Sequence, residues 1–137
     1  MKLYYSPGAC SLSPHIVLAE AGLPYTLERV DLKTKKTETG ADFFAINPAG
    51  YVPTLVLDNG EILTEGPAIV QYLADQAPAS KLAPAAGSFD RVRLQEVLNY
   101  ISTELHKSFS PLFNPAAPEE WKTFMRGQIV RRLEPME

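Results

Sequence analysis

Short apolar stretches separated by turn residues fill the first half of the chain. Four of them are rich in aromatic and branched residues or alternate apolar with polar positions, a pattern that predicts β-strands. The predicted strands are Lys2–Tyr5, Tyr25–Leu32, Tyr51–Leu57 and Glu61–Thr64. Asp58-Asn59-Gly60 between the last two predicts a hairpin with a type I′ turn, because Asn-Gly tolerates the positive φ angles of that turn.

Helical patterns lie between these strands and after them. Ser11 or Ser13 can cap a first helix, and Gly22 suits its left-handed C-cap. Residues 42–50 predict a short helix followed by an Asn-Pro-Ala-Gly turn, and a longer helix begins at residues 65–67. The order β-α-β, short helix, β-β-α predicts a mixed sheet with helices on its faces.

The second half of the chain has only helical patterns. Residues 78–87 are rich in proline, alanine and serine and predict a linker. From Phe89 apolar residues recur on one helical face, and a second helix is predicted from near Pro118. The residues of that face are Leu94, Leu98, Ile101, Leu105 and Leu112. We expect a first domain over residues 1–77 and a helical domain over 88–137 that is incomplete, since two helices cannot close a core by themselves.

Composition narrows the functional classes. The 137 residues are 45% hydrophobic and 21% charged, which is typical of a soluble globular protein. The net charge is −3, and acidic and basic residues are interspersed along the chain, so neither a nucleic-acid surface nor a membrane-binding helix is expected. No stretch approaches the ~20 apolar residues of a membrane span. A signal-peptide pattern is lacking and one cysteine excludes a disulfide framework or a cysteine-based zinc site, so we expect a cytoplasmic protein without a metal.

The single cysteine, Cys10, lies at the predicted strand-to-helix turn. A helix N-terminus stabilises a thiolate, because the aligned peptide dipoles place partial positive charge there. This position predicts a reactive thiol with a lowered pKa. The alternative is that Cys10 is a small buried apolar residue, as many lone cysteines are.

Several segments spread through the chain match one family in order. They are residues 2–15, Ala45-Ile46-Asn47-Pro48 with Val52-Pro53, Leu63-Thr64-Glu65-Gly66, Asn99, His106-Lys107 and Ser110-Pro111-Leu112-Phe113. This pattern resembles the glutathione S-transferases, and closely the bacterial beta class. The resemblance implies an α/β thioredoxin-like N-terminal domain, then an all-α glutathione-transferase C-terminal domain, usually in a homodimer. Full-length relatives continue through further helices, so the helical domain of this chain is expected to be partial.

The resemblance also implies a role for residues of the first domain. Cys10 would hydrogen-bond the glutathione thiolate or form a mixed disulfide with it. A cis Val52–Pro53 bond would turn the backbone of Val52 toward the cysteinyl part of glutathione. Glu65 and Gly66 would hold the ammonium and carboxylate of the γ-glutamyl end, although Glu65 could also be a plain helix cap. Lys35 would pair with the glycyl carboxylate, where a solvated loop lysine is the simpler expectation.

In the helical domain the resemblance favours a polar face that lines the site. Asn99, Thr103 and His106 are spaced i, i+4 and i+7, opposite the apolar stripe, and Lys107 follows them. Periodicity alone would describe the same residues as a solvated face. His106 is implied to be catalytic beside Cys10, and Asn99, Thr103 and Lys107 are implied to bind glutathione.

Two further residues of the first domain have competing interpretations. Tyr5 is a rival for thiol activation, because other transferase classes use an N-terminal tyrosine or serine, but we favour a place in the core. His15 is expected to be structural, or to support the residues that contact glutathione without contacting it itself.

The predicted function is conjugation of the glutathione thiolate to a soft electrophile, with glutathione as co-substrate and no metal or organic cofactor. One alternative is a glutaredoxin-like thiol–disulfide oxidoreductase, since Cys10-Ser11-Leu12-Ser13 has the C-x-x-S form. Another is a fragment that binds glutathione without turnover. The sequence does not identify the electrophile, because such a pocket is shaped by bulk and carries no motif.

Overall fold

The computed structural model describes residues 1–136. The chain forms two compact units, Met1–Ser88 and a second that begins at Phe89. Each unit is described by itself below. Within residues 1–136, no helix combines the length and the apolar character needed to cross a bilayer.

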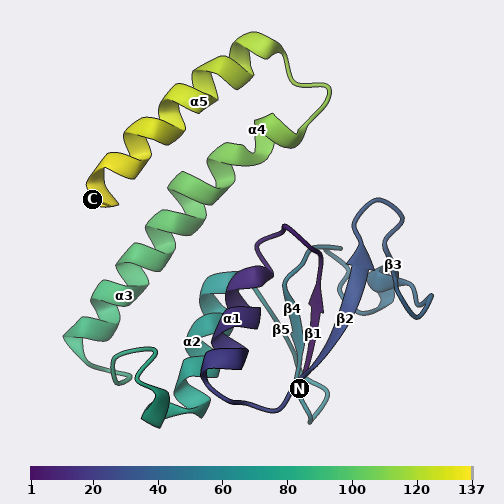
Figure 1. The fold of residues 1–137 in the computed structure, drawn as a ribbon, viewed down its shortest axis with the longest axis vertical. Helices are drawn as coiled ribbons and strands as arrows, with labels where there is room; N and C mark the ends of the chain where they lie inside the picture. Colours follow the sequence, from purple (N-terminus) through teal and green to yellow (C-terminus); the bar gives the residue numbers. More distant parts are fainter. Residues whose placement is uncertain (137) are drawn as a thin grey trace. The chain divides into compact units, whose positions relative to one another are not determined.

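The N-terminal unit is built on a five-stranded mixed sheet (Figure 1). Its elements are β1 (Lys2–Tyr5), α1 (Leu12–Glu20), β2 (Thr26–Asp31), β3 (Lys36–Thr37), η1 (Phe43–Ala45), β4 (Thr54–Val56), β5 (Ile62–Thr64), α2 (Gly66–Gln76) and η2 (Pro78–Ser80). The strand order is β3-β2-β1-β4-β5, with β1 and β2 parallel and the other pairs antiparallel. The expected thioredoxin-like arrangement is therefore confirmed. The short strand β3 lies in a stretch expected to be a polar loop.

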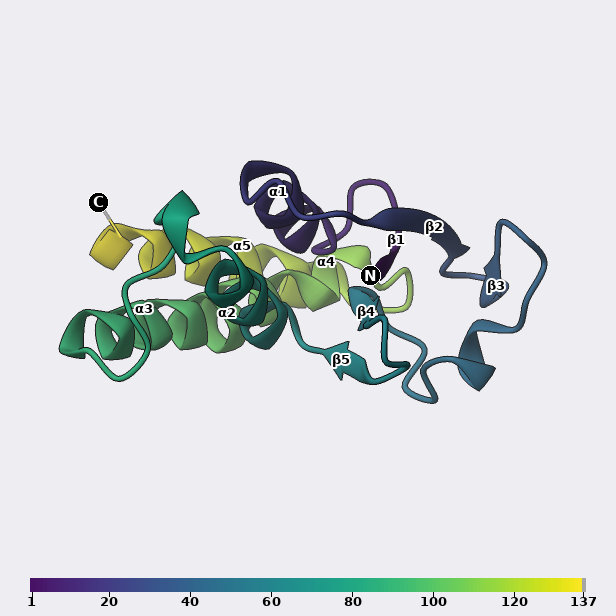
Figure 2. The same ribbon diagram turned by 90° about the horizontal axis from the view of Figure 1, so that it is seen from below.

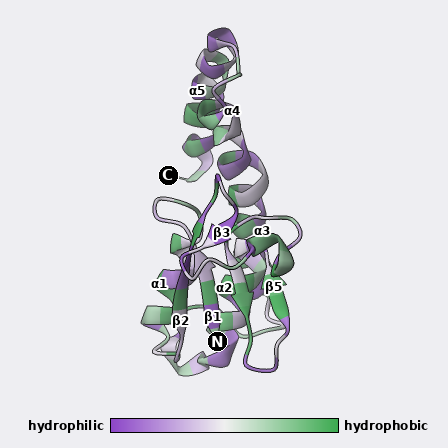
Figure 3. Cartoon of the chain, turned by 90° about the vertical axis from the view of Figure 1, so that its right-hand side faces the viewer, coloured by the Kyte–Doolittle hydropathy of each residue, from purple (hydrophilic) through white to green (hydrophobic). Residues whose placement is uncertain are grey.

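Two apolar clusters cover the two faces of this sheet. Adjacent residues of β1 point to opposite faces, so Leu3 and Tyr4 belong to different clusters. The first cluster joins β1 and β4 to α1 and α2, and its fully buried members are Leu3, Leu18, Leu55, Ile69 and Leu73. The second cluster packs η1 against the other face, and its members are Tyr4, Val30, Phe43 and Val52. Figure 2 shows α1 and α2 on one side of the sheet and the η1 segment on the other. Figure 3 shows hydrophobic and hydrophilic residues interspersed along the strands and helices of this unit.

The two ends of α1 differ in how well the sequence predicts them. Gly22 has φ +64°, and the N–H groups of Leu23 and Gly22 donate to the carbonyls of Leu18 and Ala19, which is a Schellman C-cap. The predicted serine N-cap is wrong. Ser11 precedes the helix with helical φ and ψ, and its hydroxyl makes no capping bond, because it bonds to the backbone of Ser6.

The β4–β5 hairpin is confirmed, but its turn is not type I′. The N–H of Leu57 donates to the carbonyl of Glu61 at 2.8 Å, and the N–H of Gly60 donates to the carbonyl of Leu57 at 3.0 Å. The loop therefore has three residues and ends in Gly60, whose φ is +86°. A three-residue loop with a left-handed glycine at its end suits the twist of the strands equally well.

The helical unit contains one long, irregular helical segment and a second helix. Its elements are α3 (Phe89–Tyr100), the π-helical turn η3 (Ile101–Leu105), η4 (His106–Phe109), α4 (Ser110–Phe113), α5 (Glu119–Leu133) and η5 (Glu134–Met136). The π turn carries an extra residue, which rotates the side chains that follow by about 100°. A single apolar face from Leu94 to Leu112 is therefore wrong: Leu105 is buried, whereas Ile101 is 37% exposed.

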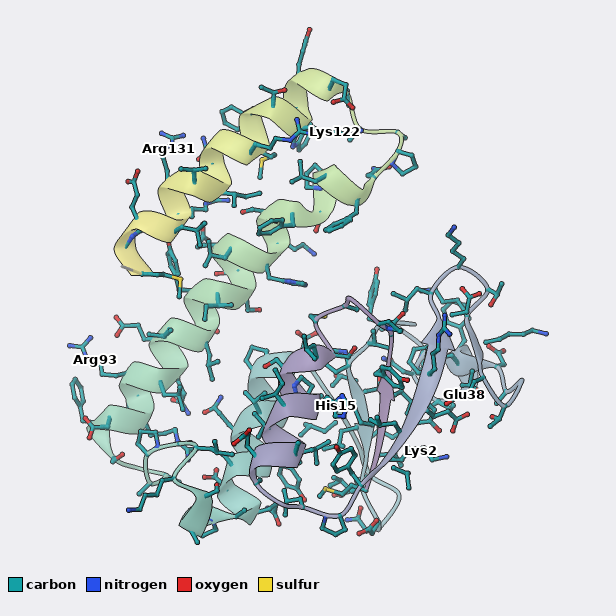
Figure 4. All side chains as sticks on the ribbon, in the orientation of Figure 1. Lys2, His15, Glu38, Arg93, Lys122 and Arg131 are labelled. Carbon is teal, nitrogen blue, oxygen red and sulfur yellow. The ribbon has the colours of Figure 1, made fainter. Side chains whose placement is uncertain are left out.

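Polar contacts join the two helical segments of this unit. The guanidinium of Arg132 on α5 pairs with the carboxylate of Glu104 at 3.2 Å, and it also donates to the hydroxyl of Ser108. The hydroxyl of Tyr100 donates to the carbonyl of Arg132 at 2.8 Å. Arg93 and Arg131 project outward from the helices (Figure 4).

Candidate functional site

A tight turn presents Cys10 at the start of α1. The hydroxyl of Ser11, which is 1% exposed, accepts from the N–H of Ser6 at 3.1 Å and donates to the carbonyl of Ser6 at 3.2 Å. The N–H of Ala9 also donates to the carbonyl of Ser6. Ser11 therefore ties the turn to the end of β1 from inside, and Cys10 beside it is exposed.

The thiol of Cys10 lies against the loop that carries Val52 and Pro53. Its Sγ donates to the carbonyl of Val52, with 3.3 Å between sulfur and oxygen. The Val52–Pro53 peptide bond is cis, as the resemblance implies. The structure thus brings together two candidate residues that are 42 positions apart in the sequence.

The pKa of the Cys10 thiol is raised, so the expectation of a lowered pKa is wrong. Burial of the sulfur against the protein is the largest cause, and the carboxylate of Glu65 adds an unfavourable negative charge. The N–H groups of Cys10 and Ser11 act in the opposite direction, as a helix N-terminus should, but they are outweighed. The residue as a whole is exposed while its sulfur is partly buried, and desolvation of the sulfur decides the direction.

A buried polar cluster around Asn47 holds the loop that carries Val52. The side-chain N–H₂ of Asn47 donates to the carbonyl of Tyr51 and to the hydroxyl of Thr54, each at 3.0 Å. Its side-chain oxygen accepts from the N–H of Ala49 at 3.0 Å. Sequence reasoning assigned no function to Asn47. The Asn-Pro-Ala-Gly turn was the available signal, but it does not show that the side chain reaches Thr54.

Lys35 is held by this same loop. Its backbone has φ +56°, and its Nζ donates to the carbonyl of Gly50 at 2.8 Å. The ammonium also lies 5.6 Å from the ring centroid of Tyr51, within the range of a cation–π contact. The simple expectation of a solvated loop lysine is therefore wrong, because both contacts restrict its position.

Glu65 and Gly66 stand at the junction of β5 and α2. Glu65 has φ +68° and ψ 114°, a conformation that residues other than glycine rarely adopt. Its carbonyl accepts from the N–H groups of Ala68 and Ile69, but its carboxylate makes no capping bond. The carboxylate therefore does not cap the helix through a hydrogen bond, and its expected interaction with the helix dipole stays a prediction. The exposed side chain faces solvent at the N-terminus of an 11-residue helix.

His15 and the tyrosines near it form a small internal cluster. The Nε2 of His15 lies 3.2 Å from the hydroxyl of Tyr25, and the two rings meet edge to face with centroids 5.6 Å apart. The ring of Tyr5 lies 6.3 Å from that of His15. His15 points from α1 toward the sheet (Figure 4). These contacts agree with a structural role for His15 and a packed Tyr5.

The helical unit exposes all four of its candidate residues, namely Asn99, Thr103, His106 and Lys107. The hydroxyl of Thr103 donates to the carbonyl of Asn99 at 3.0 Å, so it is engaged within its own helix. Asn99 precedes the π turn and His106 follows it, so the expected i, i+7 alignment on one regular helix is wrong. Among residues 1–136, no three His, Cys, Asp or Glu side chains are grouped to hold a metal ion.

Comparison with known proteins identifies close relatives. Residues 8–76 match the family model described as glutathione S-transferase, N-terminal domain. The chain is 54% identical over 134 residues to glutathione S-transferase GstA of Escherichia coli O157:H7, covering 98% of this chain and 67% of that protein. The chain therefore spans about two thirds of the length of this relative.

Solved structures show the same fold. One, a ternary complex of the bacterial transferase BphK, has a TM-score of 0.97 and 65% identity, covering 99% of this chain and 68% of that one. Another, a sphingomonad glutathione S-transferase complexed with glutathione, has a TM-score of 0.96 and 52% identity over 99% of this chain and 68% of that one.

Proposed function

The chain belongs to the glutathione S-transferase family, and from this premise we propose that it binds glutathione and conjugates its sulfur to a soft electrophile. The observation that carries the proposal is the 3.3 Å hydrogen bond between the Cys10 thiol and the Val52 carbonyl. It places a sulfur group beside the loop backbone at Val52, which we propose pairs with the tripeptide. A relative that is 52% identical binds glutathione itself.

Cys10 acts in this mechanism as a hydrogen-bond donor. Its raised pKa keeps the thiol protonated near neutral pH, so its single S–H can turn from the Val52 carbonyl to the sulfur of bound glutathione and stabilise that sulfur as a thiolate. The glutathione thiolate is the nucleophile: its electron pair forms the new carbon–sulfur bond while the electrophile's leaving group departs. A protonated Cys10 is a poor attacking group for disulfide exchange. This favours transferase over glutaredoxin-like chemistry.

Binding of glutathione at both ends fixes the position of its sulfur. The backbone of Val52, beside Pro53, pairs with the cysteinyl unit. The N–H of Gly66 at the start of α2 donates to the γ-glutamyl carboxylate, and the exposed carboxylate of Glu65 pairs with the adjacent ammonium. Lys35 pairs with the glycyl carboxylate, which its restricted position near Tyr51 favours.

Further residues that bind glutathione come from the helical unit. Asn99, Thr103 and Lys107 bind glutathione, and His106 assists the thiol pair, as their match to the family implies. The electrophile is a small molecule of unspecified class, and the physiological role is detoxification. The protein acts as a homodimer in the cytoplasm, in keeping with the family resemblance.

The test is a conjugation assay with glutathione and chlorodinitrobenzene, on the wild type and on Cys10→Ser and Cys10→Ala. We expect Cys10→Ser to retain much of the conjugation rate, because its hydroxyl is still a donor, and Cys10→Ala to lose about tenfold or more. Thiol–disulfide exchange should disappear in both. Thiol–disulfide exchange that is much faster than conjugation in the wild type would instead assign redox chemistry. Glutathione binding without conjugation of any electrophile would identify a non-catalytic module.

A further inference from the structure

We propose that Asn47 is a positioning residue that couples the thiol at Cys10 to the lysine at Lys35 through the loop of residues 49–54. Asn47 touches neither group and would touch no part of glutathione. It acts by fixing the two backbone carbonyls to which those groups bind. This inference deepens the proposed function, on which its consequences for glutathione binding rest.

The contacts of Asn47 occupy its whole side chain. Both amide hydrogens are used, one toward the carbonyl of Tyr51 and one toward the hydroxyl of Thr54, and the amide oxygen accepts from Ala49. Asn47 is 6% exposed and Thr54 is 0% exposed, so water cannot replace these partners without opening the structure. The backbone carbonyl of Asn47 also accepts from the N–H of Gly50 at 2.8 Å.

Thr54 closes the cluster from the sheet side. Its hydroxyl donates to the carbonyl of Tyr51 at 2.9 Å while it accepts from Asn47. Thr54 is the first residue of β4 and pairs with Tyr4 of β1. The loop is therefore fastened at one end to the central strand and at its middle to Asn47. A fully satisfied buried network of this kind fixes one conformation.

The loop positions both sides of the candidate site. The carbonyl of Gly50 holds the ammonium of Lys35 at 2.8 Å, and the carbonyl of Val52 accepts from the Cys10 thiol at 3.3 Å. These two carbonyls are separated by Tyr51, whose own carbonyl is the one that Asn47 and Thr54 hold. Release of the Tyr51 carbonyl would thus displace both neighbouring carbonyls.

The state of the thiol reports this displacement independently of any catalysis. A thiol that donates to a carbonyl is stabilised in its protonated form, and a sulfur that is packed against a loop is desolvated. Burial of the sulfur is the largest cause of the raised pKa of Cys10, and we expect both this burial and the bond to the Val52 carbonyl to weaken if the loop moves away. Among the described groups, the carboxylate of Glu65 and the N–H groups of Cys10 and Ser11 act on the thiol. None of these lies in the loop, so they should be unchanged.

The variants are Asn47→Ala, Thr54→Val and Thr54→Ser, with Asn59→Ala as the matched control. Thr54→Val keeps the shape but removes the hydroxyl, whereas Thr54→Ser keeps the hydroxyl. Asn59 also accepts with its side-chain oxygen and donates with its amide, but only to Glu61 in the exposed β4–β5 turn. Circular dichroism establishes which variants are folded.

The first readout is the ultraviolet absorbance of the thiolate against pH, taken as the difference between each protein and the same protein with Cys10→Ser, because the six tyrosines of the chain also absorb when they ionise. We expect the pKa of Cys10 to fall in Asn47→Ala and Thr54→Val, and to stay near the wild-type value in Thr54→Ser and Asn59→Ala. If Asn47→Ala does not fold, the Thr54 pair decides the result. Folded Asn47→Ala or Thr54→Val protein with an unchanged thiol pKa would overturn the inference, as would equal pKa values for Thr54→Val and Thr54→Ser.

The second readout is the glutathione affinity of the same variants by calorimetry. We expect the Kd of Asn47→Ala to rise about tenfold, as for the loss of one buried hydrogen-bonded donor. An unchanged Kd would overturn the role in glutathione binding. If the wild type itself does not bind glutathione, the proposed function fails, while the thiol titration still decides whether Asn47 positions the loop.

Discussion

The carboxylate of Glu28 gives a stability prediction that follows from the geometry. Glu28 on β2 is 6% exposed, and it accepts from the ammonium of Lys2 at 2.7 Å and from the hydroxyl of Thr39 at 2.6 Å. Thr39 is bonded in turn to Thr37. These contacts link β1 and β2 to the loop after β3.

These hydrogen bonds lower the pKa of Glu28 from its ordinary value of 4.5 to about 2, with the bond from Lys2 as the largest cause and the bond from Thr39 as the next. A shift of this size corresponds to about 3 kcal/mol of folding free energy if fully realised. The side chain of Lys2 is 43% exposed, so solvent screens the pair, and we expect about 1–2 kcal/mol. Because the folded pKa is the lower one, this stability is present above about pH 4.5 and is lost as the pH falls toward 2.

The perturbation is Glu28→Gln, measured by urea unfolding from neutral pH down to about pH 3. The wild type should lose more stability than the variant over this window, and the difference between the two curves should shrink toward its acid end. Glu20→Gln, which removes an exposed carboxylate of α1, is the control and should keep the wild-type pH dependence. Parallel curves for the wild type and Glu28→Gln would refute the assignment of the lowered pKa to Glu28.

Three further predictions concern the candidate site. Glu65→Gly should stabilise the fold by about 1 kcal/mol, because it relieves a positive φ that costs about 1–3 kcal/mol. The affinity for glutathione should fall, because the carboxylate is removed. A urea midpoint below the wild-type value would contradict the predicted gain in stability. Gly50→Ala should destabilise the protein more than Gly60→Ala in urea unfolding. Both glycines have positive φ, but a Cβ at residue 50 would lie 2.6 Å from the ring of Phe44, whereas nothing lies within 4 Å of a Cβ at residue 60. Equal losses of stability would refute the contact with Phe44. Lys35→Met should weaken glutathione binding but leave the affinity for γ-glutamylcysteine, which lacks the glycyl carboxylate, unchanged in calorimetry; equal weakening of both would contradict pairing with that carboxylate.

The sheet and its helices follow from the sequence because their signals are local. The alternation of apolar and polar residues in β2 and the turn residues at Gly22 and Gly60 each act within a few positions. Alternation also divides Leu3 and Tyr4 between the two faces of the sheet. The cis bond at Val52–Pro53 followed only from the family resemblance, because most bonds before proline are trans.

The features that the sequence did not predict depend on contacts between distant residues. The Ser11 hydroxyl bonds to the backbone of Ser6 and leaves α1 without a side-chain cap, and this bond forms only because the folded turn brings the two residues together. The pKa of Cys10 is raised mainly by burial of its sulfur, which lies beside Val52, 42 positions away, and this outweighs the local helix terminus. The π turn at Ile101–Leu105 has no local signal, since Leu105 fits a regular apolar stripe equally well.

The central claim is that glutathione binds beside Cys10 and Val52. The most direct test is to titrate the isotopically labelled protein with glutathione and to monitor the chemical shifts of its backbone amides by NMR. We expect saturable shifts at Cys10, Val52 and Gly66, which lie at the thiol, at its carbonyl partner and at the start of α2. Saturable binding with no change at Cys10 and Val52, or no binding at all, would contradict it.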